Sequence, residues 1–305
     1  MKLENIGFYT LSDYRAKNTS MHSPLWRCEL ILTDKCNFNC IYCRGPKKGF
    51  EGEILYKEAI NILDWCINNK LKNIRFSGGE PTLYPQLDDL IKYCKNKIEK
   101  IAISTNGSSS FEYYKYLIDC GINDISISLD ACCSSDGKKI CGGIKGGWEI
   151  VVENIKKLSI LTYVTVGIVF TRDSLYQLKN TIEFALSLGV SDIRIISAAQ
   201  YNNKKINLNK PNIGQYPILN YRISNYNNNK NVRGIQKADS NKCFLVLDDI
   251  TINKNYHFPC IIYMREYGNA IGKLNQNIRQ ERFNWFKSHN TYDDPICKQN
   301  CLDVC

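Results

Sequence analysis

The sequence lacks the features that would place this chain in a membrane or outside the cell. Its first residues, Met1 to Asn5, do not begin a charged segment followed by an apolar core, so we expect no signal peptide. No apolar run approaches the roughly 18 residues that a membrane helix needs. Together these absences predict a cytoplasmic protein with no membrane partner.

Histidine is scarce, and basic residues do not cluster. The three histidines, His22, His257 and His289, form no metal-ligand pattern, so we assign them no role. The formal net charge is +10, but the lysines and arginines form no dense block and no recognised nucleic-acid motif. We therefore interpret the excess charge as a lysine-rich surface and do not expect nucleic acid as a partner.

Cysteine, by contrast, is abundant, with 15 in the chain. An odd number in a cytoplasmic chain predicts metal or catalytic sites rather than disulfides. Cys36, Cys40 and Cys43 lie close together in one short run. Three thiolates cannot occupy the four irons of a [4Fe–4S] cube, so one iron is open to a substrate or cosubstrate. A structural zinc is the alternative, but no second short-spaced Cys or His pair follows nearby to complete it.

Hydrophobic periodicity between Arg27 and Ser197 predicts six strands that alternate with helices. The expected strands are residues 28–32, 73–77, 100–104, 124–129, 163–170 and 192–197, and the expected helices are residues 57–68, 86–98, 111–120, 148–158 and 175–188. Such alternation gives a parallel sheet. We predict an α/β fold, a partial (β/α)6 TIM-like barrel, although periodicity alone does not exclude a doubly wound sheet. In both folds the site lies at the carboxyl ends of the strands.

The chain divides by composition into four predicted parts. These are an N-terminal extension (1–26), the barrel core (27–199), an asparagine-rich connecting segment (200–242) and a small Cys-rich module (243–305). Four cysteines fall within the predicted strands and helices of the core, and we interpret them as small core hydrophobes: Cys28, Cys66, Cys94 and Cys120.

Short polar motifs end the next three predicted strands. They read Ser77-Gly78-Gly79-Glu80-Pro81, Ser104-Thr105-Asn106-Gly107 and Ser126-Ile127-Ser128-Leu129-Asp130. A CxxxCxxC run after the first strand, combined with these motifs at successive strand ends, resembles the radical S-adenosylmethionine (radical SAM) superfamily. The resemblance extends over nearly the whole chain from about Arg27.

The resemblance implies a cofactor set and an initiating reaction. Cys36, Cys40 and Cys43 would hold a [4Fe–4S] cluster whose open iron takes S-adenosylmethionine. An electron from a flavodoxin- or ferredoxin-type reductant would cleave the sulfonium, and the resulting 5′-deoxyadenosyl radical would abstract a substrate hydrogen. A non-enzymatic iron–sulfur carrier is the remaining alternative.

The resemblance also implies residues that contact S-adenosylmethionine. Gly78 and Gly79 would let the backbone approach the methionine amino group, and Glu80 would accept from that ammonium. The other expected contacts are Tyr42 at the adenine, Ser128 and Asp130 at the ribose or carboxylate, and Pro81, Thr105 and Asn106 around them.

One position departs from the family pattern. Cys141 stands about where many relatives carry an arginine, so the usual clamp on the methionine carboxylate is in question, with Arg172 or Arg194 as substitutes. Some radical SAM epimerases return a hydrogen to the substrate radical from a cysteine thiol. We therefore expect Cys141, or else Cys133, to be a hydrogen donor.

Five cysteines in the last part of the chain resemble the auxiliary-cluster extension of these enzymes, the SPASM or shorter twitch module. They are Cys243, Cys260, Cys297, Cys301 and Cys305. Five thiols imply a second, auxiliary [4Fe–4S] cluster held by four of them, with Cys301 favoured over Cys305 as the fourth ligand. A structural zinc is the alternative here too.

The resemblance leaves the substrate open. The leading class is a ribosomally synthesised peptide that undergoes epimerisation, crosslinking or oxidation. The N-terminal 26 residues are too short for a leader-recognition domain, so a peptide substrate would need either direct binding in the barrel or a separate leader-peptide-binding partner. The alternatives are a small molecule such as an aminoglycoside sugar, epimerised or dehydrogenated, and a tRNA or cofactor-biosynthesis substrate.

Overall fold

The computed structural model describes residues 18–199, 206, 208 and 216–302. Six parallel strands form one curved sheet and lie side by side in the order in which they occur along the chain. This sequential order rules out a doubly wound sheet, in which strand order reverses, and confirms the partial barrel. The strands are β1 (Arg27–Thr33), β2 (Asn73–Gly78), β3 (Lys100–Thr105), β4 (Asp124–Ser128), β5 (Tyr163–Phe170) and β6 (Asp192–Ser197).

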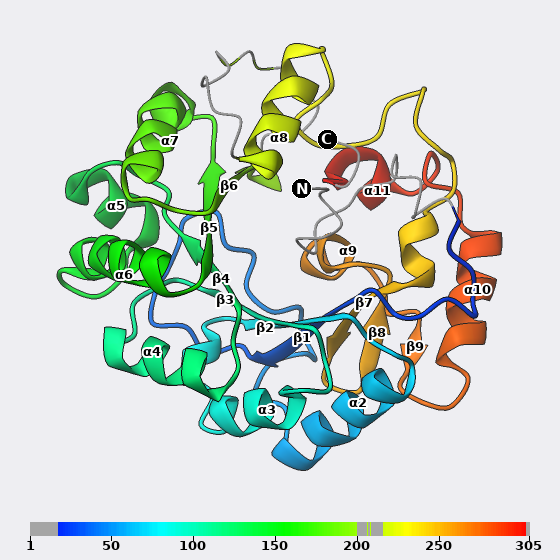
Figure 1. Ribbon diagram of the computed structural model, residues 1–305. Helices are drawn as coiled ribbons and strands as arrows, with labels where there is room; N and C mark the ends of the chain where they lie inside the picture. The colour runs from blue at the N-terminus through cyan, green and yellow to red at the C-terminus, as the bar shows by residue number, and fades with distance from the viewer. Residues whose placement is uncertain (1–17, 200–205, 207, 209–215, 303–305) are drawn as a thin grey trace.

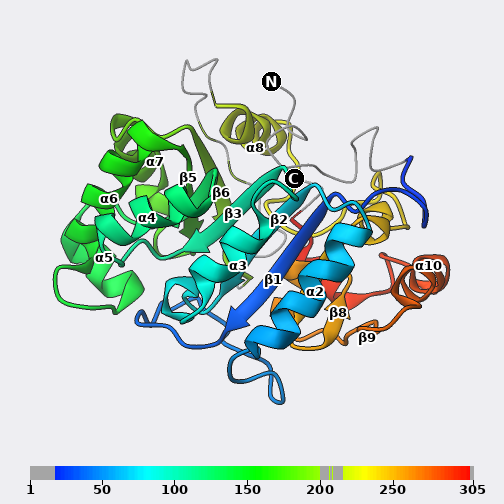
Figure 2. The same ribbon diagram turned by 60° about the horizontal axis from the view of Figure 1, so that its bottom comes forward.

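Helices cover the outer face of this sheet, as Figure 1 shows, and Figure 2 shows two of them, α2 and α3, lying against β1 and β2. The outer helices are α2 (Tyr56–Asn68), α3 (Leu87–Cys94), α4 (Phe111–Cys120), α6 (Gly147–Leu161) and α7 (Leu178–Ser187). Short 3-10 turns η2 (Pro81–Leu83) and η3 (Leu175–Gln177) begin after β2 and before α7. The predicted strands and helices agree with these bounds to within a few residues.

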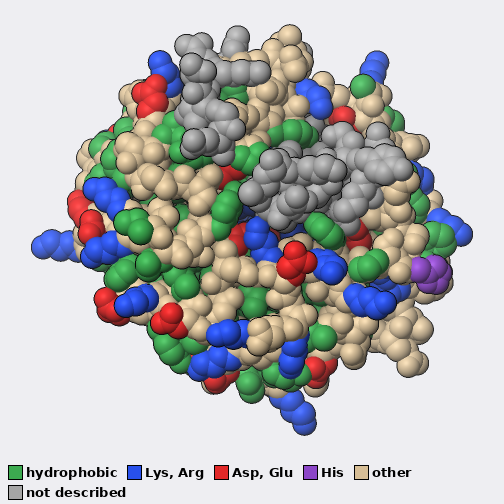
Figure 3. All heavy atoms as spheres, viewed as in Figure 1, with side chains coloured by type: hydrophobic (Ala, Val, Ile, Leu, Met, Phe, Trp, Pro, Cys, Tyr) green, Lys and Arg blue, Asp and Glu red, His purple; other side chains and the backbone are tan. Residues whose placement is uncertain are grey.

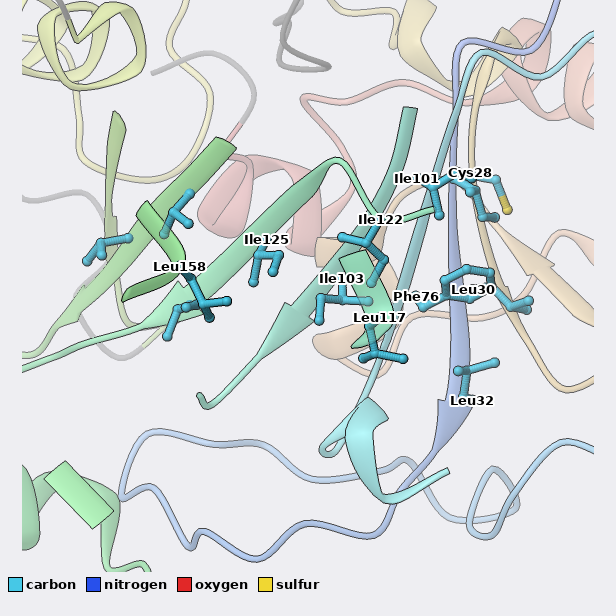
Figure 4. Packing of buried hydrophobic residues seen from close by; sticks show 14 of the residues in the cluster. Cys28, Leu30, Leu32, Phe76, Ile101, Ile103, Leu117, Ile122, Ile125 and Leu158 are labelled. Carbon is cyan, nitrogen blue, oxygen red and sulfur yellow. The ribbon is translucent and has the colours of Figure 1, made fainter. Parts of the chain in front are cut away.

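The hydrophobic core lies between the sheet and these helices (Figure 4). Alternate strand residues such as Leu30, Phe76 and Ile103 point outward and are fully buried. The intervening residues line the concave inner face, where Arg75 donates to Ser104 Oγ at 3.2 Å. A polar inner face enclosed by an apolar shell is suited to hold a polar ligand. The core cysteines are buried, as predicted: Cys28, Cys66, Cys94 and Cys120.

The last part of the chain extends the same sheet. Strand β7 (Asp249–Asn253) pairs in parallel with β1, and β8 (Tyr256–Phe258) and β9 (Gly272–Lys273) follow antiparallel. The sheet therefore continues across the boundary predicted at residue 243. The remaining elements are α5 (Ser134–Cys141), α8 (Pro217–Asn227), η5 (Phe244–Leu247), α9 (Ile261–Arg265), α10 (Ile278–Ser288) and α11 (Pro295–Asn300).

Arg282 ties α10 to the added strands. Its side chain is 1% exposed, and it donates to the carbonyl oxygens of Val246, Phe258 and Asp249 at 2.7, 2.9 and 2.6 Å. A buried guanidinium is stable only where such acceptors surround it. One side chain therefore holds α10 against the barrel sheet. We call the last part of the chain, residues 243–305, the tail.

None of the helices in the described ranges is long and apolar enough to cross a bilayer. On the face seen in Figure 3, basic and acidic side chains are interspersed rather than gathered by sign.

Candidate active site

The three clustered cysteines lie in the loop that follows β1, at the carboxyl end of the sheet. Cys36 and Cys43 are exposed and Cys40 is half-buried, and all are free thiols. The backbone N–H of Phe38 donates to Cys36 Sγ at 3.4 Å, and this bond opposes the burial that raises the pKa of the Cys36 thiol. Three accessible, unbridged thiols in one loop are a donor set that fits an iron–sulfur cluster with one open iron. We call residues 36–43 the cluster loop.

The glycines after β2 pack directly against the backbone that leads into the cluster loop. A Cβ added to Gly78, whose φ is +154°, would lie 2.3 Å from the carbonyl oxygen of Thr33, and one on Gly79 would lie 2.3 Å from that of Lys35. The N–H groups of Gly79 and Glu80 donate to these same two oxygens at 2.7 and 2.8 Å. Glycine is thus required here because the loop backbone occupies the space of a side chain.

Glu80 joins the ends of β2 and β3. The residue is fully buried, and its Oε1 accepts from the Thr105 hydroxyl at 2.7 Å while its Oε2 accepts from the Asn106 N–H at 2.7 Å. Burial raises the pKa of Glu80, opposed by these hydrogen bonds. The carboxylate therefore has a structural role in bridging two of the predicted motifs, and Pro81, buried at the start of η2, follows it.

Asn106 connects the same strand end to the cluster loop. Its Nδ2 donates to Asn37 Oδ1 at 2.7 Å and lies 3.9 Å from Cys36 Sγ. The structure therefore brings Asn106, from the end of β3, to the cluster loop.

Tyr42 and Asp130 meet at the end of β4. The Tyr42 hydroxyl donates to Asp130 Oδ2 at 2.5 Å, and the N–H of Val169 donates to Oδ1 at 2.6 Å. Burial raises the pKa of Asp130 to about 6. Sequence reasoning assigned both residues to S-adenosylmethionine separately, and no sequence signal pairs them. Ser128 is exposed at the same strand end.

Cys141 lies beside the cluster loop. The carbonyl oxygens of Cys141 and Ile140 accept from the N–H groups of Asn39 and Ile41 at 2.8 and 2.9 Å, so the end of α5 pairs with the loop backbone. A hydrogen bond with the Cys40 thiol, together with burial and Asp130, raises the pKa of the Cys141 thiol. Cys141, the expected hydrogen donor, therefore lies next to the cluster loop.

Cys133 is placed differently from Cys141. It lies at the opposite end of α5, where its Sγ contacts Asp136 Oδ2 at 3.2 Å.

Four of the five tail cysteines line one pocket, and Cys305 lies outside the described residues. The lining cysteines are Cys243, Cys260, Cys297 and Cys301. Burial and then the other three thiols raise the pKa of Cys297, which reflects their proximity. Four convergent thiols with aromatic neighbours Tyr263 and Trp285 are a donor set that fits a fully ligated cluster.

His289 is a neighbour of this pocket that sequence reasoning missed. Its Nε2 lies 3.5 Å from Cys297 Sγ, and its ring stacks on Trp285 at a centroid distance of 3.8 Å. His289, Asp294 and Cys297 also present ligand atoms within 4.8 Å of one another. These nitrogen, oxygen and sulfur ligand atoms also suit a zinc ion, which stays the alternative occupant of this pocket. The spacing of His289 and Cys297 in the sequence matches no metal-ligand pattern, so their contact is evident only in the folded structure.

The tail packs against the segment that follows the cluster loop and against residues 77–79, which we call the glycine motif. Lys47 Nζ donates to the carbonyl oxygen of Tyr267 at 2.9 Å, and Arg44 pairs with Glu266 at 3.5 Å. Arg265 lies 3.5 Å from Ser77 Oγ and from the carbonyl oxygen of Gly78. The two cysteine sites thus belong to one contiguous structure.

Comparison with known proteins matches the chain to a family model and to curated relatives. Residues 30–185 match the model of the Radical SAM superfamily. A probable GTP 3',8-cyclase of Methanococcus maripaludis is 34% identical over 131 residues, 42% of this chain and 43% of that protein. The chain thus matches less than half of that relative's length. A Pyrococcus furiosus protein named tungsten-containing aldehyde ferredoxin oxidoreductase cofactor-modifying protein is 27% identical, over 90% of this chain and 87% of its own.

Solved structures share the fold at low sequence identity. SuiB of Streptococcus suis aligns with a TM-score of 0.60 and 17% identity, covering 90% of this chain and 67% of its own. The structure of anSMEcpe with bound AdoMet aligns with a TM-score of 0.57 and 14% identity, covering 86% and 82%. Both alignments extend well beyond the residues that the family model matches, and at these identities they support the fold alone.

Proposed function

Because this chain belongs to the radical SAM superfamily, and is therefore an enzyme that uses a [4Fe–4S] cluster and S-adenosylmethionine, we propose that it modifies a ribosomally synthesised peptide. The observation that carries this proposal is the tail pocket, where four thiols meet on an extension of the barrel sheet. SuiB, which shares this fold over 93% of the chain, has been solved with its precursor peptide SuiA. The reaction we propose is epimerisation, crosslinking or oxidation of that peptide.

The cluster loop and the strand-end motifs have separate tasks in this proposal. Cys36, Cys40 and Cys43 hold the first cluster, and bound S-adenosylmethionine supplies a 5′-deoxyadenosyl radical. Gly78 and Gly79 set the loop against the end of β2, because no side chain fits between them. Glu80 keeps the ends of β2 and β3 together, so that the groups contacting the cosubstrate stay in register.

The tail pocket has its own proposed occupant. Cys243, Cys260, Cys297 and Cys301 hold a second [4Fe–4S] cluster, and four ligands leave it no open iron. Its proposed role is to relay electrons and to support the substrate pocket from the side of β7. Cys141 is the proposed hydrogen donor if the product is an epimer.

A second candidate is a small-molecule reaction in cofactor biosynthesis. It is favoured by the identity of 34% to a probable GTP 3',8-cyclase, which exceeds the identity to the peptide-modifying neighbours. That match covers only 42% of this chain, whereas the alignment with SuiB bound to its precursor peptide covers 93%.

The two proposed functions differ in the molecule from which the 5′-deoxyadenosyl radical takes a hydrogen, and an experiment can distinguish them. Short peptides encoded beside the gene are co-expressed with the enzyme and analysed by mass spectrometry, and purified enzyme is incubated with GTP in parallel. The peptide proposal predicts a peptide that has lost hydrogen, or that gains one deuterium from deuterated water, with GTP unchanged. Conversion of GTP with every peptide unmodified would contradict it.

A further inference from the structure

Arg265 brings a positive charge from the tail to the glycine motif of the barrel. It is the last residue of α9, the helix that begins directly after Cys260 at the tail pocket. One guanidinium nitrogen lies 3.5 Å from both Ser77 Oγ and the carbonyl oxygen of Gly78. A residue more than 180 positions away in sequence therefore stands at the end of β2.

The guanidinium of Arg265 has no carboxylate within ion-pair distance among the residues described for this chain, and it is half-exposed. The adjacent Glu266 pairs instead with Arg44 and Arg233, at 3.5 and 3.6 Å. A guanidinium carries five N–H donors, and the two long contacts to β2 use only one of its nitrogens. Arg265 is therefore able to bind an anion at this strand end.

We propose that Arg265 binds the methionine carboxylate of S-adenosylmethionine. In an amino acid the amino and carboxylate groups share one carbon, so a cation beside the backbone that receives the amino group is within reach of the carboxylate. A guanidinium matches a carboxylate with two parallel hydrogen bonds. The proposal rests on the placement of the amino group at Gly78 and Gly79, and it does not depend on which substrate is modified.

The two arginines that sequence reasoning offered for this role stand elsewhere. Arg172 is exposed in the segment after β5. Arg194 lies inside β6, three residues before its end, and contacts Ser126 Oγ at 3.5 Å. The sheet itself therefore carries no arginine that contacts the glycine motif in the described structure, and the tail supplies one.

Binding measurements with two ligands test this assignment. Cluster-loaded wild type, Arg265→Ala and Arg172→Ala are titrated anaerobically, without substrate, with S-adenosylmethionine and with its decarboxylated analogue. Arg265→Ala should weaken S-adenosylmethionine binding by about 10- to 100-fold, the range of a charged hydrogen bond, and should leave analogue binding nearly unchanged. Arg172→Ala should bind both ligands as wild type does.

Iron content and thermal unfolding confirm that each variant is folded and loaded, and Arg265→Lys should recover part of the lost affinity because it keeps the charge. The assignment is overturned if Arg265→Ala keeps the wild-type preference for S-adenosylmethionine over the analogue. An equal loss of affinity for both ligands would also overturn it, because such a loss does not involve the carboxylate.

Discussion

The hydroxyl of Tyr42 donates a hydrogen bond of 2.5 Å to the buried carboxylate of Asp130. Tyr42 belongs to the cluster loop and Asp130 follows β4, so this bond holds the loop across the top of the barrel. The same carboxylate accepts from the N–H of Val169 in β5. One acidic side chain therefore fixes the cluster loop relative to two strands.

Removing the Tyr42 hydroxyl should destabilise the fold. Tyr42→Phe leaves Asp130 with one donor fewer, and a lost hydrogen bond to a charged group costs about 1.5–3 kcal/mol of unfolding free energy. Chemical denaturation of the metal-free protein measures this change. Tyr116→Phe is the matched control, because Tyr116 donates to Asp88 at the surface, and its loss should be clearly smaller. Equal losses of unfolding free energy in the two variants would show that the Tyr42–Asp130 bond stabilises the fold no more than a surface hydrogen bond does.

A methyl group at Gly79 should prevent the first cluster from binding at the cluster loop. The Cβ of Gly79→Ala would lie 2.3 Å from the carbonyl oxygen of Lys35 and 2.5 Å from that of Asp34, so the backbone before Cys36 must move. We expect reconstituted Gly79→Ala to lose the iron of the loop site while retaining that of the tail site. Gly167→Ala is the control, since its Cβ would meet only the Ile127 carbonyl oxygen, at 3.9 Å. Full iron loading of Gly79→Ala would refute this steric argument.

The tail cysteines should account for half of the bound iron. Wild type reconstituted under anaerobic conditions should hold about eight irons, the number in two [4Fe–4S] clusters. Cys243→Ser and Cys301→Ser should each hold about four, whereas Cys305→Ser should match wild type. If Cys305→Ser lost iron and Cys301→Ser did not, the fourth ligand would be Cys305. Zinc in place of the second set of four irons would support the alternative occupant.

The contribution of His257 to stability should fall as the pH drops through the titration range of unfolded histidine. Burial, with Arg282 nearby, lowers the pKa of His257 to about 4, so the folded protein keeps this ring neutral while the unfolded chain protonates it. The unfolded state then binds more protons, and the contribution of His257 should cost about 1.4 kcal/mol between pH 7.5 and 5.5. Denaturation of the metal-free protein at both pH values measures it.

The matched variant for that measurement is His257→Gln, which retains a hydrogen-bonding side chain but does not titrate. On going from pH 7.5 to 5.5, wild type should lose about 1.4 kcal/mol of stability relative to this variant, because the buried Asp130, whose raised pKa changes stability in the opposite direction, is common to both proteins. An identical change in both proteins would show that other groups cause the pH dependence.

The core of the barrel was predictable because its strands and outer helices bury continuous apolar faces that leave a periodic sequence. The short helix α5 was missed because it is largely polar, with serine or lysine at half of its positions. Strands β7 to β9 were missed because β7 pairs with β1, some 220 residues earlier. The location of the motifs at strand ends was predictable from residue type and position, whereas the Tyr42–Asp130 and His289–Cys297 contacts arise only when the chain folds.

The most direct test of this account is the formation of 5′-deoxyadenosine. Anaerobically reconstituted wild type, supplied with S-adenosylmethionine and a strong one-electron reductant, should produce it, and Cys40→Ser should not, because the loop site loses a ligand. Absence of 5′-deoxyadenosine from fully loaded wild type would contradict the assignment of the cluster loop as the site of S-adenosylmethionine cleavage.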